Sequence, residues 1–162
     1  MLADTPPTIA TSANPVQVVT SFEFMIDAPI ARAAPLFGPE AERAWCGPEW
    51  DPRFIYPTPA RDVEGAVFTL DHDGQHTVWV NTRFDLANGQ LQYVVLTPGL
   101  LVTTVDVALG SVGTRTHARV TYTRTAMTAE AREHPHALAR ADEAKGPEWH
   151  DAIAAMLGRG TG

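Results

Sequence analysis

The sequence predicts an α+β domain in which an antiparallel sheet of six or seven strands is covered on one face by a long C-terminal helix. Strand-like segments meet at tight turns such as Asp73-Gly74 and Pro98-Gly99, and no strand–helix–strand alternation is present. Apolar and polar residues alternate between residues 100 and 125, which indicates one buried and one wet face of the sheet. After residue 128 the apolar residues follow a helical period.

The first third of the chain predicts one strand followed by two short helices. Residues 16–26 are rich in β-branched and aromatic side chains, as is typical of a strand. A short helix is expected over residues 30–37, because Pro29 suits a first helical turn. A second short helix over residues 40–45 should end at Gly47-Pro48.

Six further segments predict the strands of an antiparallel meander: residues 54–56, 66–70, 77–84, 91–96, 100–109 and 114–125. If Leu109 lies opposite Thr114, the two faces of the last hairpin differ sharply. The face expected to be buried carries Leu101, Val105, Val107, Ala118, Val120 and Tyr122. The face expected to be exposed carries Asp106, Arg115, His117 and Arg119.

The C-terminal segment predicts the helix that covers the sheet. One candidate buried stripe consists of Ala137, Leu138, Ala141 and Ala144. Gly146-Pro147 should either kink one long helix or separate two helices in line. Beyond it, a spacing of i, i+4, i+7, i+8 predicts an amphipathic helix with Trp149, Ile153, Met156 and Leu157 on its buried face.

Length and composition favour one domain over residues 16–158, preceded by a flexible N-terminal lead-in over residues 1–15. The net charge of −7 argues against a nucleic-acid partner, and no apolar run is long enough for membrane insertion. Cys46 is the only cysteine, so no internal disulfide can form, and a cytoplasmic location is expected.

Residues 36–57 form a segment unusually rich in aromatic side chains. It contains Trp45, Trp50, Phe54 and Tyr56, which are costly to leave in water, while its prolines and glycines prevent one continuous helix. We therefore expect a short helix and a bent loop that form one wall of an apolar pocket.

Short motifs in this chain also resemble those of a known superfamily. They are Ala28-Pro29 at the start of a helix, Leu36-Phe37, Glu42 three residues before Trp45, Asp51-Pro52, Tyr56-Pro57, Thr121-Tyr122 and Glu148-Trp149. With the order of the predicted elements, they resemble the START-like, birch-pollen-allergen-like superfamily. It is also called SRPBCC, and it includes proteins labelled polyketide cyclase/dehydrase. One departure is Glu49, where members have a glycine before the second tryptophan.

The resemblance implies a helix-grip fold, in which a curved sheet wraps around the C-terminal helix and leaves an apolar cavity. Its implied function is the binding of a hydrophobic or amphipathic small molecule, such as a lipid. No cofactor or metal is expected from the sequence. The implied ligand-binding residues are Trp45, Trp50, Tyr56, Trp79, Tyr93, Leu101, Tyr122, Trp149 and Ile153. Two alternatives are a cyclase- or dehydratase-type enzyme that uses the same cavity and a protein-interaction module like the activators of the heat-shock ATPase. A monomer and a homodimer both remain open.

Glu42 and Tyr122 are the candidate catalytic residues. Glu42 should share a helix face with buried Trp45, so its pKa should be raised unless an arginine such as Arg83 or Arg124 pairs with it. An unpaired carboxylate facing an open cavity would favour an enzyme, and satisfied ion pairs would favour a binding protein.

Three other sets of polar residues are better explained by structural roles than by metal binding or catalysis. Two histidines and two aspartates of residues 71–76 are possible zinc ligands, but a solvated hairpin tip is the preferred interpretation. His117 opposite Asp106 is interpreted as part of a surface charge ladder, and Cys46 as a buried, inert thiol.

Overall fold

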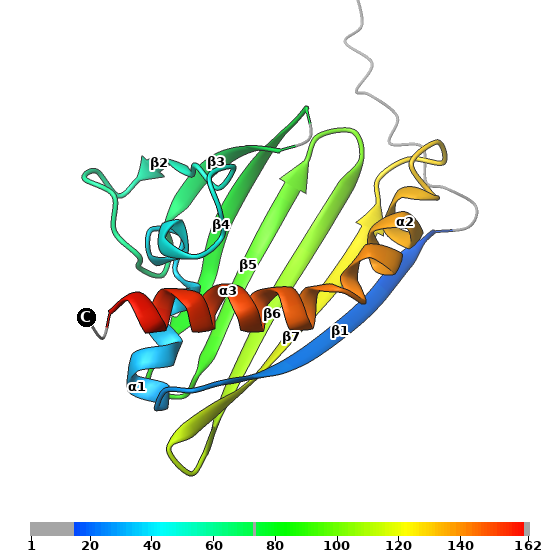
Figure 1. Cartoon of the computed structure of the whole chain (residues 1–162). Coiled ribbons are helices and arrows are strands. Elements are labelled where there is room, and N and C mark those ends of the chain that lie inside the picture. Colours follow the sequence, from blue (N-terminus) through cyan, green and yellow to red (C-terminus); the bar gives the residue numbers. More distant parts are fainter. Residues whose placement is uncertain (1–14, 73, 161–162) are drawn as a thin grey trace, which may run out of the picture.

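The computed structural model describes residues 15–72 and 74–160 and contains one seven-stranded antiparallel sheet that curves around a C-terminal helix (Figure 1). The strand order is β1-β7-β6-β5-β4-β3-β2, so the predicted antiparallel sheet is confirmed. The strands are β1 Gln17–Ile26, β2 Arg53–Tyr56, β3 Val67–His72, β4 Gln75–Asp85, β5 Gln90–Thr97, β6 Leu101–Val112 and β7 Arg115–Ala126. The predicted lead-in over residues 1–15 lies, apart from Pro15, outside the described residues.

The helices lie where the sequence indicates, but several are shorter than expected. The first predicted helix consists of α1 Ile30–Ala33 and the 3-10 helix η1 Ala34–Phe37, and the second is the 3-10 helix η2 Ala41–Ala44. The C-terminal helices are α2 His134–Asp142 and α3 Lys145–Arg159, and α3 crosses the concave side of the sheet in Figure 1. None of these helices has the length and apolarity needed to cross a bilayer.

The register of the β6–β7 hairpin differs from the predicted one, but each side chain lies on the predicted face of the sheet. Leu109 lies opposite Ala118 rather than Thr114. The shift is four residues, an even number, so every side chain keeps its face because strand side chains alternate with a period of two. The predicted inner residues are therefore buried, including Val105 opposite Tyr122.

The outer face of the same hairpin agrees only in part with the prediction. Arg115 and Arg119 are exposed, whereas Asp106 and His117 are half-buried. The expected pairing of His117 with Asp106 is wrong, because the register places each of them opposite another residue. The Nε2 atom of His117 instead lies 3.6 Å from Glu23 of β1.

The α2–α3 junction differs from the predicted helix in a way that matters for the site. The break falls at residues 143–144, so Gly146 and Pro147 lie in the first turn of α3, where a missing proline N–H is tolerated. The predicted alanine stripe on α2 is wrong, since Ala137, Ala141 and Ala144 are exposed. The predicted face of α3 is confirmed, with Ile153 and Leu157 buried in the core.

A buried ion pair between Arg124 of β7 and Asp142 of α2 explains why α2 turns Asp142 rather than its alanines toward the sheet. The two side chains are only 4% and 3% exposed. Both guanidinium NH₂ groups donate to the Asp142 carboxylate, one of them over 3.0 Å, and Thr20 of β1 also donates to it. Burial alone would raise the pKa of Asp142, but the hydrogen bonds from Arg124, Lys145 and Thr20 outweigh it and hold the pKa below its usual value.

The Arg124→Met variant should lose about 3 kcal/mol or more of unfolding free energy, because it leaves the Asp142 carboxylate buried without its main partner. Urea denaturation followed by circular dichroism measures this loss. The control is Arg119→Met on the same strand, which removes an exposed ion pair with Glu23 and should cost less than about 1 kcal/mol. Equal losses in the two variants would contradict the structural importance of the buried pair.

Candidate functional site

A cavity of about 360 Å³ lies between the concave face of the sheet and helix α3. Strands β3 to β7 form its floor, and residues of the loop after η2 and of the two C-terminal helices close its sides. Six of the residues predicted to bind a ligand border this cavity: Trp50, Trp79, Tyr93, Leu101, Tyr122 and Trp149. Their role in binding stays a prediction.

The other three predicted ligand-binding residues lie outside the cavity wall. Trp45 and Ile153 are buried in the adjoining core, where the Trp45 ring lies 5.3 Å from that of Trp149. The expectation that Tyr56 is buried is wrong, since it is 60% exposed. The pairing of β2 with β3 is irregular between Phe54 and Tyr56, so only Phe54 turns inward, where it stacks on Phe68 at 5.4 Å.

The aromatic wall presents ring surface to the cavity and keeps its polar atoms turned to the protein. Trp50 packs edge-on against Trp79 at 5.6 Å, and Trp79 lies 6.1 Å from Tyr93. Their three polar tips donate to Pro39 O, Thr77 Oγ1 and Phe37 O, respectively, over 2.8, 2.9 and 2.7 Å. These aromatics therefore offer a bound molecule apolar contact and no free hydrogen-bond donor.

Glu42 is placed on the cavity wall by a short, tightly held helix. The Asp62 carboxylate accepts hydrogen bonds from the backbone N–H groups of Glu40 and Ala41 at the start of η2, over 2.8 and 3.1 Å. A Cβ atom on Gly38 would come within 2.3 Å of Asp62 Oδ2, so only glycine allows this approach.

The Glu42 carboxyl group has no hydrogen bond or ion pair within residues 15–72 and 74–160. Arg124, one suggested partner, is bound to Asp142 instead. Burial, and secondarily the nearby charge of Asp62, raise the pKa of Glu42 well above its usual value. At this wall the cavity therefore offers a carboxyl group with a strong tendency to stay protonated.

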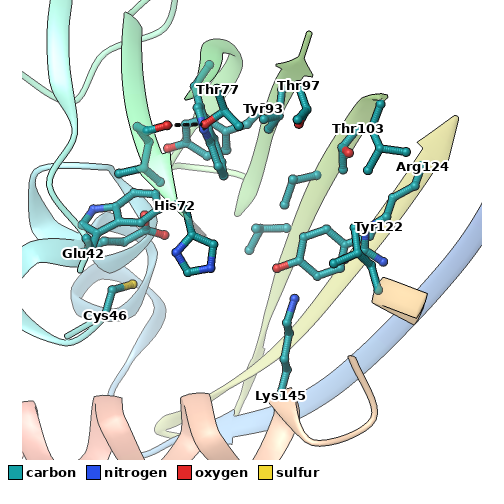
Figure 2. A pocket seen from close by; sticks show the side chains of 18 of the residues that line it. Glu42, Cys46, His72, Thr77, Tyr93, Thr97, Thr103, Tyr122, Arg124 and Lys145 are labelled. Carbon is teal, nitrogen blue, oxygen red and sulfur yellow. Dashed lines mark hydrogen bonds between the residues drawn. The ribbon is translucent and has the colours of Figure 1, made fainter. Parts of the chain in front are cut away.

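Tyr122, Arg124 and Lys145 form the opposite wall, across from Glu42, Cys46 and His72 (Figure 2). The Lys145 ammonium lies 4.4 Å and the Arg124 guanidinium 4.3 Å from the centroid of the Tyr122 ring. Burial, followed by the Asp142 charge, raises the pKa of Tyr122, so its hydroxyl stays protonated at neutral pH. No described residue forms a hydrogen bond with this hydroxyl.

Lys145, which borders the cavity, and its partner Asp142 are not among the residues predicted from the sequence. A signal was present, because Leu138, Asp142, Lys145 and Trp149 follow a 4-3-4 spacing that places them on one helical face. Burial and the neighbouring Glu42 raise the pKa of Cys46, so this cavity residue is a neutral thiol.

The β3–β4 hairpin does not assemble a metal site from its described residues. His76 pairs with Asp71, and His72 lies 3.8 Å from Glu49 and also borders the cavity. Asp73, the fourth residue of the suggested set, lies outside the described residues. Within the described chain, no three histidine, cysteine or acidic side chains gather as metal ligands would.

Comparison with known proteins identifies the fold. No family model and no curated protein matches the sequence. Truncated norcoclaurine synthase from Thalictrum flavum is similar in structure with a TM-score of 0.68 and 10% identity, covering 91% of this chain and 97% of that one. A protein of Rhizobium leguminosarum has a TM-score of 0.62 and 20% identity over 90% and 97% of the two chains. Ara h 8.0201 is similar in structure with a TM-score of 0.60 and 13% identity, covering 88% of this chain and 99% of that one.

At these identities the comparisons show the fold alone. The chain has the helix-grip fold, as the order of its predicted elements indicated.

The Glu42→Gln variant should gain stability relative to the wild type as the pH rises. The folded state holds the Glu42 proton more tightly than the unfolded state, so ionisation destabilises the fold once the pH exceeds about 4.3, the pKa of an unfolded glutamate. Glutamine cannot ionise, so the gain should approach roughly 1.4 kcal/mol for each pKa unit of the shift. Urea midpoints at pH 5 and pH 8 measure it.

The control for this experiment is Glu49→Gln, which removes a largely exposed carboxylate from the loop that follows η2 and should keep the wild-type midpoints. An equal stability difference between Glu42→Gln and the wild type at both pH values would contradict the interpretation of Glu42.

Proposed function

We propose that the protein binds a compact hydrophobic or amphipathic small molecule in the cavity between the sheet and α3. The observation that carries this proposal is the cavity of about 360 Å³ with its aromatic and aliphatic wall. Ligand pockets commonly measure roughly 300–1,000 Å³, so this volume favours a compact ligand over a long-chain lipid. Norcoclaurine synthase from Thalictrum flavum, which shares the fold, has been solved in complex with dopamine and hydroxybenzaldehyde, and these small aromatic molecules support the proposed size class.

The apolar wall is a sufficient source of affinity. Micromolar binding requires about 8 kcal/mol, which burial of about 330 Å² of apolar ligand surface would supply before the cost of immobilising the ligand. A small neutral aromatic molecule should therefore bind with a dissociation constant in the micromolar range or above. Polar groups on the ligand would then decide selectivity.

A second candidate function is catalysis of the cyclase or dehydratase type. The observation that favours it is the Glu42 carboxyl group, which borders the cavity and has no partner among the described residues. Such a group can give a proton to a carbonyl or hydroxyl group of a bound molecule, or accept one after ionisation. The interaction-module alternative is less well supported, because it requires a filled core. The large exposed apolar residues also come from four different strands and the residue after β7: Val19, Ile55, Tyr56, Leu96, Val112 and Met127.

The Val105→Phe variant should lose binding of 1-aminoanthracene, a neutral fluorescent probe, by about tenfold or more. Val105 lies on the cavity floor between Tyr93 and Tyr122, and the larger ring would occupy the space that the probe needs. A fluorescence titration measures the dissociation constant. The matched control is Val102→Phe on the opposite face of β6, which should bind like the wild type. Equal binding by both variants, or none by the wild type, would contradict a cavity binder.

The catalytic candidate can be tested with 5-nitrobenzisoxazole, an apolar probe that opens its ring when a base removes one proton. In the apolar cavity the ionised Glu42 should accelerate this reaction by roughly 100-fold over the Glu42→Gln variant. The rate, followed by absorbance of the phenolate product, should rise with pH as Glu42 ionises. Glu49→Gln serves as the control and should react like the wild type. If Glu42→Gln reacts as fast as the wild type, Glu42 does not exchange protons with a bound molecule.

A further inference from the structure

Lys145 projects from the first turn of α3 into the cavity, and Figure 2 shows its ammonium group beside the ring and hydroxyl of Tyr122. Its side chain is 28% exposed, and its Nζ lies 2.8 Å from Asp142 Oδ1. An ammonium group carries three donors, and Asp142 is its only described ionic partner. Lys145 therefore has donors left for a molecule in the cavity.

The charges at this wall do not cancel. Arg124 and Lys145 contribute two positive charges, and Asp142 contributes one negative charge. The Asp142 carboxylate already receives bonds from Thr20 and from both guanidinium NH₂ groups of Arg124. Arg124 also borders the cavity, but its side chain is buried and both of its NH₂ groups donate to Asp142, so the positive charge with donors left for a ligand is that of Lys145.

We propose that this wall is an anion subsite, in which Lys145 and the Tyr122 hydroxyl bind the carboxylate of an aromatic or other compact apolar ligand. This inference rests on the proposed binding function and adds the chemical class of the ligand. The Lys145 ammonium supplies the opposite charge, and the Tyr122 hydroxyl, which has no hydrogen-bond partner among the described residues, donates a hydrogen bond to the same head group. The ligand body then extends along Leu101 and Val105 toward Trp79.

The opposite wall is compatible with a negatively charged ligand. Glu42 is the one acidic residue that borders the cavity within the described chain, and burial raises its pKa, which favours its neutral form. A neutral carboxyl group does not repel an anion and can donate a hydrogen bond to a second polar group of the ligand. A cationic ligand would instead meet the surplus positive charge of Lys145.

The test compares two probes of nearly equal shape, 2-naphthoate and 2-naphthamide, by displacement of 1-aminoanthracene from the full-length protein. The wild type should bind the carboxylate about tenfold more tightly or better, since a charge-assisted contact in a partly buried site contributes this much. The Lys145→Met variant, in which Arg124 still compensates Asp142, should bind both probes with similar affinity. The Arg140→Met control removes one exposed positive charge from α2 and should keep the wild-type preference.

Chemical modification provides a second readout, because Lys145 is the only lysine in the sequence. Acetylation by sulfosuccinimidyl acetate, followed by peptide mass spectrometry, therefore reports on this side chain without interference from other lysines. Bound 2-naphthoate should slow acetylation of Lys145 severalfold, whereas the reaction of the N-terminal amine, the internal control, should not change. At concentrations that give equal occupancy, 2-naphthamide should protect Lys145 less.

The outcomes separate the subsite from the binding function. If the wild type binds 2-naphthamide as tightly as 2-naphthoate, or if Lys145→Met keeps the preference, the anion subsite is overturned while the binding function stands. If neither naphthalene compound nor 1-aminoanthracene binds the wild type, the binding function fails and the subsite fails with it. A preference that is lost only in Lys145→Met, together with protection of Lys145, supports the subsite.

Discussion

The buried ion pair between Arg124 and Asp142 is the contact on which the helical part of the cavity wall, formed by Leu138, Lys145 and Trp149, depends. It attaches the end of α2 to strands β1 and β7 through Arg124 and Thr20. Lys145 and Trp149 follow within two helical turns and are thereby directed at the concave face of the sheet. A buried ion pair adds little net stability over an apolar substitute, because its desolvation is costly. The pair instead fixes the position of α2 on the sheet, because charged side chains with specific partners permit fewer alternative positions of the helix than alanines would.

The cavity combines an inert lining with a small number of available polar groups. Trp50, Trp79 and Tyr93 all turn their polar atoms to backbone or side-chain acceptors of the protein itself. The ionisable groups that can bind a ligand or exchange a proton with it therefore lie at the two ends of the cavity. Glu42 lies on one wall, and Tyr122 and Lys145 lie on the other (Figure 2). Such a separation suits a ligand with an apolar middle and different polar groups at its ends. It also means that a single cavity can be consistent with binding and with proton transfer.

The sequence predicted the features that depend on local periodicity, and it missed those that depend on distant partners. Alternation and turn residues identified all seven strands and the inner face of the last hairpin, but the register was wrong by four residues because Gly110 and Gly113 both offer a turn. The alanine stripe on α2 satisfied the helical period, yet Arg124, 18 positions earlier in the chain, binds Asp142 and rotates the helix. Tyr56 followed the aromatic pattern of its loop, but the irregularity in β2 turned it to solvent.

The four tryptophans of the chain all gather at this one place in the fold. Trp50, Trp79 and Trp149 border the cavity, and Trp45, which does not border it, packs against the ring of Trp149. With rings only 5 to 6 Å apart within each pair, excitation energy absorbed by one indole passes readily to its neighbour. The intrinsic ultraviolet emission of this protein is therefore a property of the cavity rather than of the molecule at large. The fold thus contains its own optical reporter, which needs no label to register whether the cavity is empty or occupied.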